Sequence, residues 1–311
     1  MTSKRVFLFP GQGSQTVGML GEWATHPVVK QTFDEASAVL GYDLADLIQN
    51  GPAEELNKTF VAQPALLATS VALYRAYIAE DGDVPDYMAG HSLGEYSALV
   101  CAEAIPFAQG IKLVEQRGKF MQAAVPEGTG GMAAIIGLPA EKVVECCAEA
   151  ADGEVVSAVN FNSPIQTVIA GQAEAVVRAS AVCKDAGAKR VVPLPVSVPS
   201  HCALMEPAAA QLQVALGDVD VNLPQVSVVN NADVAIRTEP DAIIGALVRQ
   251  LFSPVRWSET VTWLADDGVT EAYEFGPGAV LTGLIKRAEK RIAIKTVNTA
   301  EAAVLLANGE E

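Results

Sequence analysis

Apolar residues follow two different periods along the chain. Short runs rich in β-branched and aromatic side chains, such as residues 5–9, predict buried strands. Longer stretches with apolar residues three and four positions apart, such as residues 27–40, predict helices that bury one face. Further helices are predicted at 53–58, 64–79, 106–124, 204–216, 241–252, 257–264 and 280–288, and further strands at 87–89, 226–229, 271–275 and 293–297. This alternation favours an α/β fold with a mostly parallel sheet between layers of helices.

The middle of the chain has a different order of elements. The pattern predicts strand, helix, strand, strand, helix and strand at 132–136, 140–151, 155–160, 167–170, 173–186 and 190–195, which is the ferredoxin-like βαββαβ unit. A glycine-rich stretch at 127–131 and a proline-rich one at 193–199 flank it. We therefore expect residues 1–127 and 199–311 to form an α/β-hydrolase-like catalytic subdomain, and 128–198 an inserted small subdomain. A ligand site is expected in the cleft between them.

Charge and composition narrow the classes of partner. With 37 acidic and 21 basic residues the formal net charge is -16, which argues against nucleic acid and anionic membranes as main partners. No apolar stretch is long enough for a bilayer span, and the apolar run within the first ten residues is too short for a signal peptide. Five cysteines without metal-type spacing are typical of reduced thiols. We expect a soluble, cytoplasmic, monomeric protein without a bound metal or cofactor.

Residues 90–95, Gly-His-Ser-Leu-Gly-Glu, stand between an apolar run and a helical pattern. Strand, sharp turn and helix form the context in which Gly-x-Ser-x-Gly indicates a nucleophile elbow, with Ser92 exposed at the turn. Gly90 and Gly94 would allow backbone to pass closely on either side. The N–H of Leu93 would lie in the first helical turn, where amides lack partners and favour an anion. The alternative is a glycine-rich turn with Ser92 as an ordinary helix N-cap.

Two other residues stand out. Gln12 lies between two glycines after the first predicted strand, where α/β folds place ligands, although on spacing alone a plain turn residue is favoured. Arg117 has Leu113, Val114, Phe120 and Met121 as its helical neighbours, so it should face inward and require an anion. That anion is either an internal Asp or Glu or a substrate carboxylate held by the guanidinium group.

A serine nucleophile needs a base, and the chain has three histidines. His91 adjoins Ser92, so its side chain should point elsewhere, and His26 precedes an N-terminal helix. His201 remains, in a proline-stiffened loop downstream of the serine, as in hydrolases with the serine before the histidine. No Asp or Glu is evident as a third member. The pattern permits a Ser-His pair whose imidazole is oriented by a carbonyl or an amide.

Several motifs together resemble the malonyl-CoA:acyl carrier protein transacylases, the discrete bacterial enzymes of type II fatty acid synthesis. They occur in order over nearly the whole chain at 9–15 (Phe-Pro-Gly-Gln-Gly-Ser-Gln), 90–95, 117–121 (Arg-Gly-Lys-Phe-Met), 160–164 (Asn-Phe-Asn-Ser-Pro), 199–201 (Pro-Ser-His) and 276–278 (Gly-Pro-Gly). The resemblance implies transfer of malonate from malonyl-CoA to the phosphopantetheine thiol of holo acyl carrier protein, by a ping-pong sequence through acylated Ser92.

The resemblance also implies roles for individual residues. His201 would be the general base, and Gln250 would steady it. Leu93 N–H and the backbone at Gln12 would form the oxyanion hole. Substrate binding would involve Arg117, which clasps the malonyl carboxylate, and Asn162, which lines the pocket.

Alternatives remain at this stage. A serine thioesterase or esterase would use the same Ser-His pair, and a catalytically silent scaffold would bind carrier protein without reacting. Because acyl carrier protein is acidic like this chain, docking would need a local basic patch. The candidate residues are Lys189 and Arg190, or Lys286, Arg287, Lys290 and Arg291, with solvated helix faces as the alternative interpretation.

Overall fold

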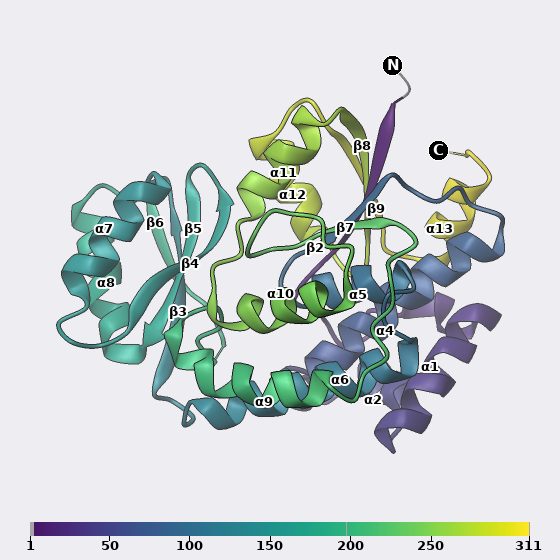
Figure 1. Cartoon of the computed structure of the whole chain (residues 1–311), viewed down its shortest axis with the longest axis horizontal. Coiled ribbons are helices and arrows are strands. Elements are labelled where there is room, and N and C mark those ends of the chain that lie inside the picture. The colour runs from purple at the N-terminus through teal and green to yellow at the C-terminus, as the bar shows by residue number, and fades with distance from the viewer. Residues whose placement is uncertain (1–2, 197, 311) are drawn as a thin grey trace.

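The computed structural model describes residues 3–196 and 198–310. Within them, a five-stranded sheet has the order β7-β2-β1-β8-β9, and every neighbouring pair is parallel, as predicted. The strands are β1 (Lys4–Phe9), β2 (Tyr87–Gly90), β7 (Ser227–Val229), β8 (Val269–Phe275) and β9 (Ala293–Val297). Figure 1 shows this sheet in the body of the molecule, with β1 between segments that come from distant parts of the chain.

The central strand β1 is apolar on both faces because helices cover both sides of the sheet. Phe7 and Phe9 face one core, where the ring of Phe7 lies 4.6 Å from that of Phe275. Val6 and Leu8 face the opposite core with Trp257. These four side chains are completely buried, which explains why residues 6–9 form one continuous apolar run in the sequence.

Helices from several parts of the chain cover the two faces of this sheet. The Phe7 side carries α1, α4, α5, α6, α9, α10 and α13, whereas α11 and α12 pack on the Trp257 side. Their bounds are α1 (Pro27–Leu40), α2 (Leu44–Asn50), α3 (Ala53–Leu56), α4 (Thr59–Ala79), α5 (Leu93–Cys101), α6 (Phe107–Ala124), α9 (Glu206–Leu216), α10 (Pro240–Phe252), α11 (Trp257–Asp266), α12 (Val280–Ala288) and α13 (Ala300–Ala307), with 3-10 turns η1 (Gly21–Thr25) and η2 (Ala203–Met205).

A second, antiparallel sheet lies at the left of Figure 1 with α7 and α8 on its outer face. Its strand order is β4-β5-β3-β6. The elements are β3 (Gly130–Ile136), α7 (Ala140–Ala150), β4 (Val156–Ser163), β5 (Gln166–Gln172), α8 (Ala173–Asp185) and β6 (Arg190–Pro193). The predicted ferredoxin-like unit is therefore confirmed. The division of the chain at 127/128 and 198/199 stays a prediction, and Ser197 in the proposed 193–199 joint lies outside the described residues.

One predicted boundary is wrong for a clear reason. Pro64 was expected at the start of a helix, where its missing N–H does no harm. Instead α4 begins at Thr59 and Pro64 lies inside it. Tertiary packing outweighs the lost backbone hydrogen bond here, because α4 is buried over most of its length. Helix α2 was not predicted at all. No helix in the described ranges has the length and apolarity to cross a membrane.

Candidate active site

Ser92 stands on a sharp turn between β2 and α5. Its backbone has φ 52° and ψ -107°, a conformation that non-glycine residues rarely adopt. The backbone at this turn is too tightly packed for side chains at its glycines. A Cβ built on Gly90 would lie 1.9 Å from the carbonyl carbon of Gly94, and one on Gly94 would lie 2.0 Å from the Phe9 oxygen. The close approach predicted at both glycines is confirmed.

The side chain of Ser92 pairs with His201. Ser92 occupies the N-cap position, but in the described structure its hydroxyl makes no capping bond. Instead Ser92 Oγ lies 2.7 Å from His201 Nε2, and His201 Nδ1 lies 2.7 Å from the backbone oxygen of Gln250. A carbonyl oxygen only accepts, so Nδ1 carries the proton and Nε2 is free to accept one from Ser92. The capping alternative for this hydroxyl is therefore wrong.

Burial controls the protonation state of His201. The ring is only 2% exposed. Burial lowers its pKa to about 3, with the positive charge of Arg117 acting in the same direction. The imidazole is therefore neutral at physiological pH, as a general base must be.

Arg117 is a buried cation held by neutral groups. Its side chain is 1% exposed, and burial lowers its pKa. Nη1 donates to Gln63 Oε1 at 2.7 Å, and Nη2 donates to Gln250 Oε1 at 3.1 Å. Nη2 also lies 3.4 Å from Ser92 Oγ, which places the charge beside the serine. Among the described residues no carboxylate lies within ion-pair distance of Arg117, and its Nε has no hydrogen-bond partner. No internal Asp or Glu therefore contacts this arginine directly, although the charge of buried Glu95 offsets part of the effect of burial on the Arg117 pKa.

Close helix packing brings Gln63 to Arg117. A Cβ on Gly118 would lie 2.4 Å from the Cα of Phe60, so α6 meets the backbone of α4 at this point. Gln63 follows one turn later on α4 and is fully buried. Gly118 therefore lets the backbone of α4 pass directly beside α6, next to Arg117.

A small cavity of about 100 Å³ opens onto these groups. Gln12, Leu93 and Arg117 lie on its walls together with the Ser92–His201 pair. The remaining wall is mostly apolar. Met121 of α6 forms one part of it, and Met132 of the small sheet forms another, together with Leu194, Val196 and Val198 from the segment after that sheet. Gln12 Nε2 lies 3.3 Å from Thr59 Oγ1. The cavity can admit a short acyl group beside the serine, with a cation at one side.

Asn162 does not line this cavity. It accepts a hydrogen bond at 2.8 Å from Nε2 of His91, and His91 and Asn160 line the cavity instead. Residues two apart normally share one face of a strand, but the register of β4 against β5 shifts after Ala158 and again after Phe161. The expectation that Asn162 itself forms the pocket wall is therefore corrected, since its contact is one layer further out.

The sequence analysis did not assign three residues of this site. Gln63 contacts Arg117, Glu95 accepts from the Gln250 side chain at 2.8 Å, and Asn231 accepts from Ser92 N at 2.7 Å. Each had a usable signal. Gln63 and Glu95 are polar residues in otherwise apolar helical runs, and Asn231 follows the end of a buried strand. In the described part of the chain, no cluster of His, Cys, Asp or Glu has an arrangement suited to a metal ion.

A serine on a strand–turn–helix elbow, paired with a buried neutral histidine beside an acyl-sized cavity, is typical of enzymes that form acyl-serine intermediates. Comparison with known sequences places the chain within that class. The profile of the acyl transferase domain family matches residues 6–308, and the chain belongs to this family.

The curated relatives share one name, and each of them aligns with nearly the full length of this chain. A malonyl CoA-acyl carrier protein transacylase of Escherichia coli K12 is 62% identical over 94% of this chain and 95% of its own. The protein of that name from Bacillus subtilis is 46% identical over 97% and 96%. Among solved structures, an acyl carrier protein S-malonyltransferase from Vibrio cholerae has a TM-score of 0.95 at 58% identity, covering 98% of this chain and all of that one. A malonyl-transacylase in complex with a type II PKS acyl-carrier protein has a TM-score of 0.97 at 57% identity, covering 99% of this chain and 100% of that one.

Proposed function

We propose that this protein transfers a malonyl group from CoA to the phosphopantetheine thiol of acyl carrier protein, for fatty acid biosynthesis, through an acyl-enzyme on Ser92. The observation that carries the proposal is Arg117, a buried guanidinium with neutral protein partners beside the serine. The charge of buried Glu95 acts on Arg117 only at a distance, through the shared Gln250 side chain. A buried cation without a directly bonded anion is unfavourable, and the free carboxylate of a malonyl group supplies one. The names of the relatives support the same substrate and carrier.

The first half-reaction follows from the geometry around Ser92. The hydroxyl transfers its proton to His201 Nε2 as Oγ attacks the thioester carbonyl. The developing oxyanion is then stabilised by the N–H of Leu93, at the first turn of α5, and by the backbone N–H of Gln12. When the intermediate collapses, the C–S bond breaks and His201 returns its proton to the departing CoA thiolate.

The second half-reaction runs the same steps with the carrier thiol as nucleophile. The thiol loses its proton to His201 and its sulfur attacks the malonyl-serine ester. The C–Oγ bond then breaks and His201 reprotonates Ser92. The Gln250 carbonyl fixes the imidazole through Nδ1 in both halves, so a neutral acceptor takes the place of the usual triad carboxylate.

A substrate switch at Arg117 tests this proposal. Replacing Arg117 by Ala removes the partner of the malonyl carboxylate, so kcat/KM for malonyl-CoA should fall at least about 30-fold. Acetyl-CoA has no carboxylate, and its use should be unchanged or improved. Lys119→Ala, an exposed change two residues along the same helix, is the control. Equal losses for malonyl-CoA and acetyl-CoA in Arg117→Ala would show that the arginine only maintains structure.

Docking of the carrier protein belongs to the same proposal. Among the predicted basic residues, Arg291 contacts Asp266 and Glu289 at 2.7 Å each, which offsets its charge. Lys189 and Arg190 are exposed, and the described structure records no ion pair for either. Lys189 directly precedes β6 and Arg190 begins it, and this strand leads to Leu194 and Val196 in the cavity wall. Lys286, Arg287 and Lys290 are also exposed, with no ion pair recorded in the described structure. Because Lys189 and Arg190 lie next to the segment that forms the cavity wall, we favour these two as the contact for an acidic carrier.

A further inference from the structure

The Ser92 turn is held by a residue from a distant loop. Asn231, just beyond β7, accepts a hydrogen bond from Ser92 N at 2.7 Å through Oδ1. Its Nδ2 donates to the Gly90 oxygen at 2.6 Å. One amide side chain therefore clamps the backbone before and at the serine, without touching the hydroxyl.

Glu95 connects this clamp to the histidine side of the site. Its carboxylate is completely buried and accepts hydrogen bonds from Asn230 Nδ2 (2.6 Å), Asn231 N (3.0 Å) and Gln250 Nε2 (2.8 Å). The same Gln250 Nε2 also donates to the backbone carbonyl oxygen of Ser92 at 2.9 Å. Glu95 thus joins three segments of the chain. Helix α5 positions Ser92, the loop after β7 positions Asn231, and α10 positions the Gln250 carbonyl that accepts from His201.

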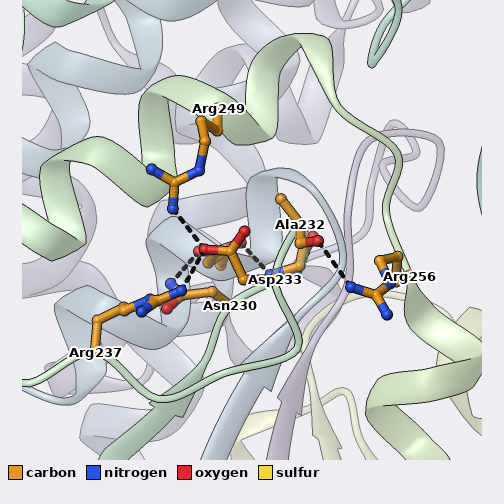
Figure 2. A network of polar contacts seen from close by, with 8 residues as sticks. Asn230, Ala232, Asp233, Arg237, Arg249 and Arg256 are labelled. Carbon is orange, nitrogen blue, oxygen red and sulfur yellow. Dashed lines mark hydrogen bonds and ion pairs between the residues drawn. The ribbon is translucent and has the colours of Figure 1, made fainter.

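The outer side of that loop is fixed to the same helix. Asp233 accepts from Arg249 at 2.5 Å and from Arg237 at 2.7 Å, and Arg256 donates to the Ala232 oxygen (Figure 2). Figure 2 shows Arg249 reaching down from its helix to the Asp233 carboxylate. Because Arg249 precedes Gln250, the loop is attached to α10 on both its buried and its exposed side.

Such bracing matters because the serine conformation is unfavourable. A non-glycine residue with φ 52° and ψ -107° persists only where its surroundings hold it. If the clamp is lost, the turn relaxes and Oγ moves away from Nε2. Glu95 itself has no recorded contact in the described structure with Ser92 Oγ or with either nitrogen of His201, so it does not transfer the proton.

We propose that Glu95 and Asn231 are positioning residues that hold Ser92 in its reactive conformation. The inference deepens the proposed function and rests on it for the reaction, but the geometry can be probed without malonyl-CoA. If Glu95 and Asn231 have this role, variants that lack either side chain should react more slowly at Ser92 while binding substrate normally. A merely structural role would lower stability without a selective effect on Ser92.

The test compares Glu95→Gln and Asn231→Ala with Glu274→Gln. Glu274 is also a completely buried glutamate, and it accepts from Leu281 N (2.9 Å) and Thr282 N (2.7 Å) at the start of α12, so it is a matched control. The rate at which diisopropyl fluorophosphate labels Ser92 is measured by intact mass. The kcat and KM for malonyl-CoA and the melting temperature are measured on the same samples.

We expect labelling and kcat to fall about 10- to 100-fold in Glu95→Gln and Asn231→Ala, with KM within about threefold of the unchanged protein. Glu274→Gln should lower the melting temperature and keep the labelling rate. Labelling at the unchanged rate in Asn231→Ala, or equal slowing in all three variants, would overturn the inference. If Glu95→Gln does not fold, Asn231→Ala decides alone. Normal labelling of the unchanged protein without malonyl transfer would instead refute the proposed function.

Discussion

At the scale of single residues, His201 shows how an enzyme keeps a base neutral without a carboxylate partner. The ring is enclosed, lies near the positive charge of Arg117, and donates through Nδ1 to a carbonyl that carries no charge. Burial and the nearby charge of Arg117 disfavour the imidazolium form, and together they outweigh the hydrogen bond to the carbonyl, which favours it. The general base is therefore ready over a wide pH range, because protonation competes only in acid.

The pH profile of acylation follows from this. Since burial lowers the pKa of His201 from 6.5 to about 3, kcat/KM for malonyl-CoA should show no step near 6.5. The rate is measured by stopped-flow release of CoA between about pH 5 and 8, where an unperturbed histidine would titrate. Folding stability, in contrast to the rate, should depend on pH in this range. The unfolded chain binds a proton at His201 below pH 6.5 and the folded chain does not, so stability falls from there toward about 3. A rate that halves near pH 6.5 would contradict this account of the base.

At the scale of elements, the contact of α4 with α6 positions Arg117, the cation that faces the substrate carboxylate. Gly118 lets α6 approach the backbone of α4 at Phe60, and Gln63 of α4 then reaches the Arg117 guanidinium. Neither helix would hold the arginine in place alone. The helix pair, rather than a loop, therefore orients the charge, which suits a site that must recognise a carboxylate at a fixed distance from Ser92.

Filling this contact should weaken both stability and binding. In Gly118→Ala the new methyl group would meet the Phe60 backbone at 2.4 Å, so the helices must move apart. We expect the free energy of unfolding to fall by about 1–3 kcal/mol, the usual range for overpacking, and KM for malonyl-CoA to rise. Urea unfolding and initial-rate kinetics measure the two effects. Gly283→Ala is the control, because its Cβ would have only ordinary contact with Arg287 at 3.5 Å. An equally stable Gly118→Ala variant would show that the helices are not tightly packed.

At the scale of the whole molecule, much of the architecture could be predicted because local patterns and folding rules agree. Apolar strand runs that alternate with helices specified the parallel sheet, and the βαββαβ order specified the small antiparallel one. The Ser92 turn was evident because glycines are needed at 90 and 94. Contacts between distant segments were not accessible. Glu95 and Asn231 are 136 residues apart, and no local period reveals such a pair.

The overall charge sets the conditions for partner binding. A chain of formal charge -16 repels an acidic carrier protein, so productive docking depends on a local reversal of sign. The exposed Lys189 and Arg190 lie at the edge strand β6 beside the cavity wall, whereas Arg291 is offset by two acidic neighbours. The docking surface should therefore lie on the small sheet.

Charge reversal tests the location of docking. The double change Lys189→Glu and Arg190→Glu should raise KM for holo carrier protein about tenfold at low salt, and the effect should shrink as salt screens the contact. The rate of Ser92 acylation by malonyl-CoA should not change, since the carrier takes no part in it. Lys290→Glu with Arg291→Glu is the matched control and should have the smaller effect. If this control raises KM more, docking lies at the turn between α12 and β9 instead.

The most direct measurement of the central claim is the intact mass of the protein after incubation with malonyl-CoA, before and after holo carrier protein is added. We predict a malonyl adduct that forms in the unchanged protein, is absent in Ser92→Ala, and moves to the carrier thiol when the carrier is added. An adduct that is lost to water while the carrier stays unacylated would indicate a serine thioesterase. If no adduct forms and the carrier gains no malonate, the protein is not an acyltransferase acting through Ser92.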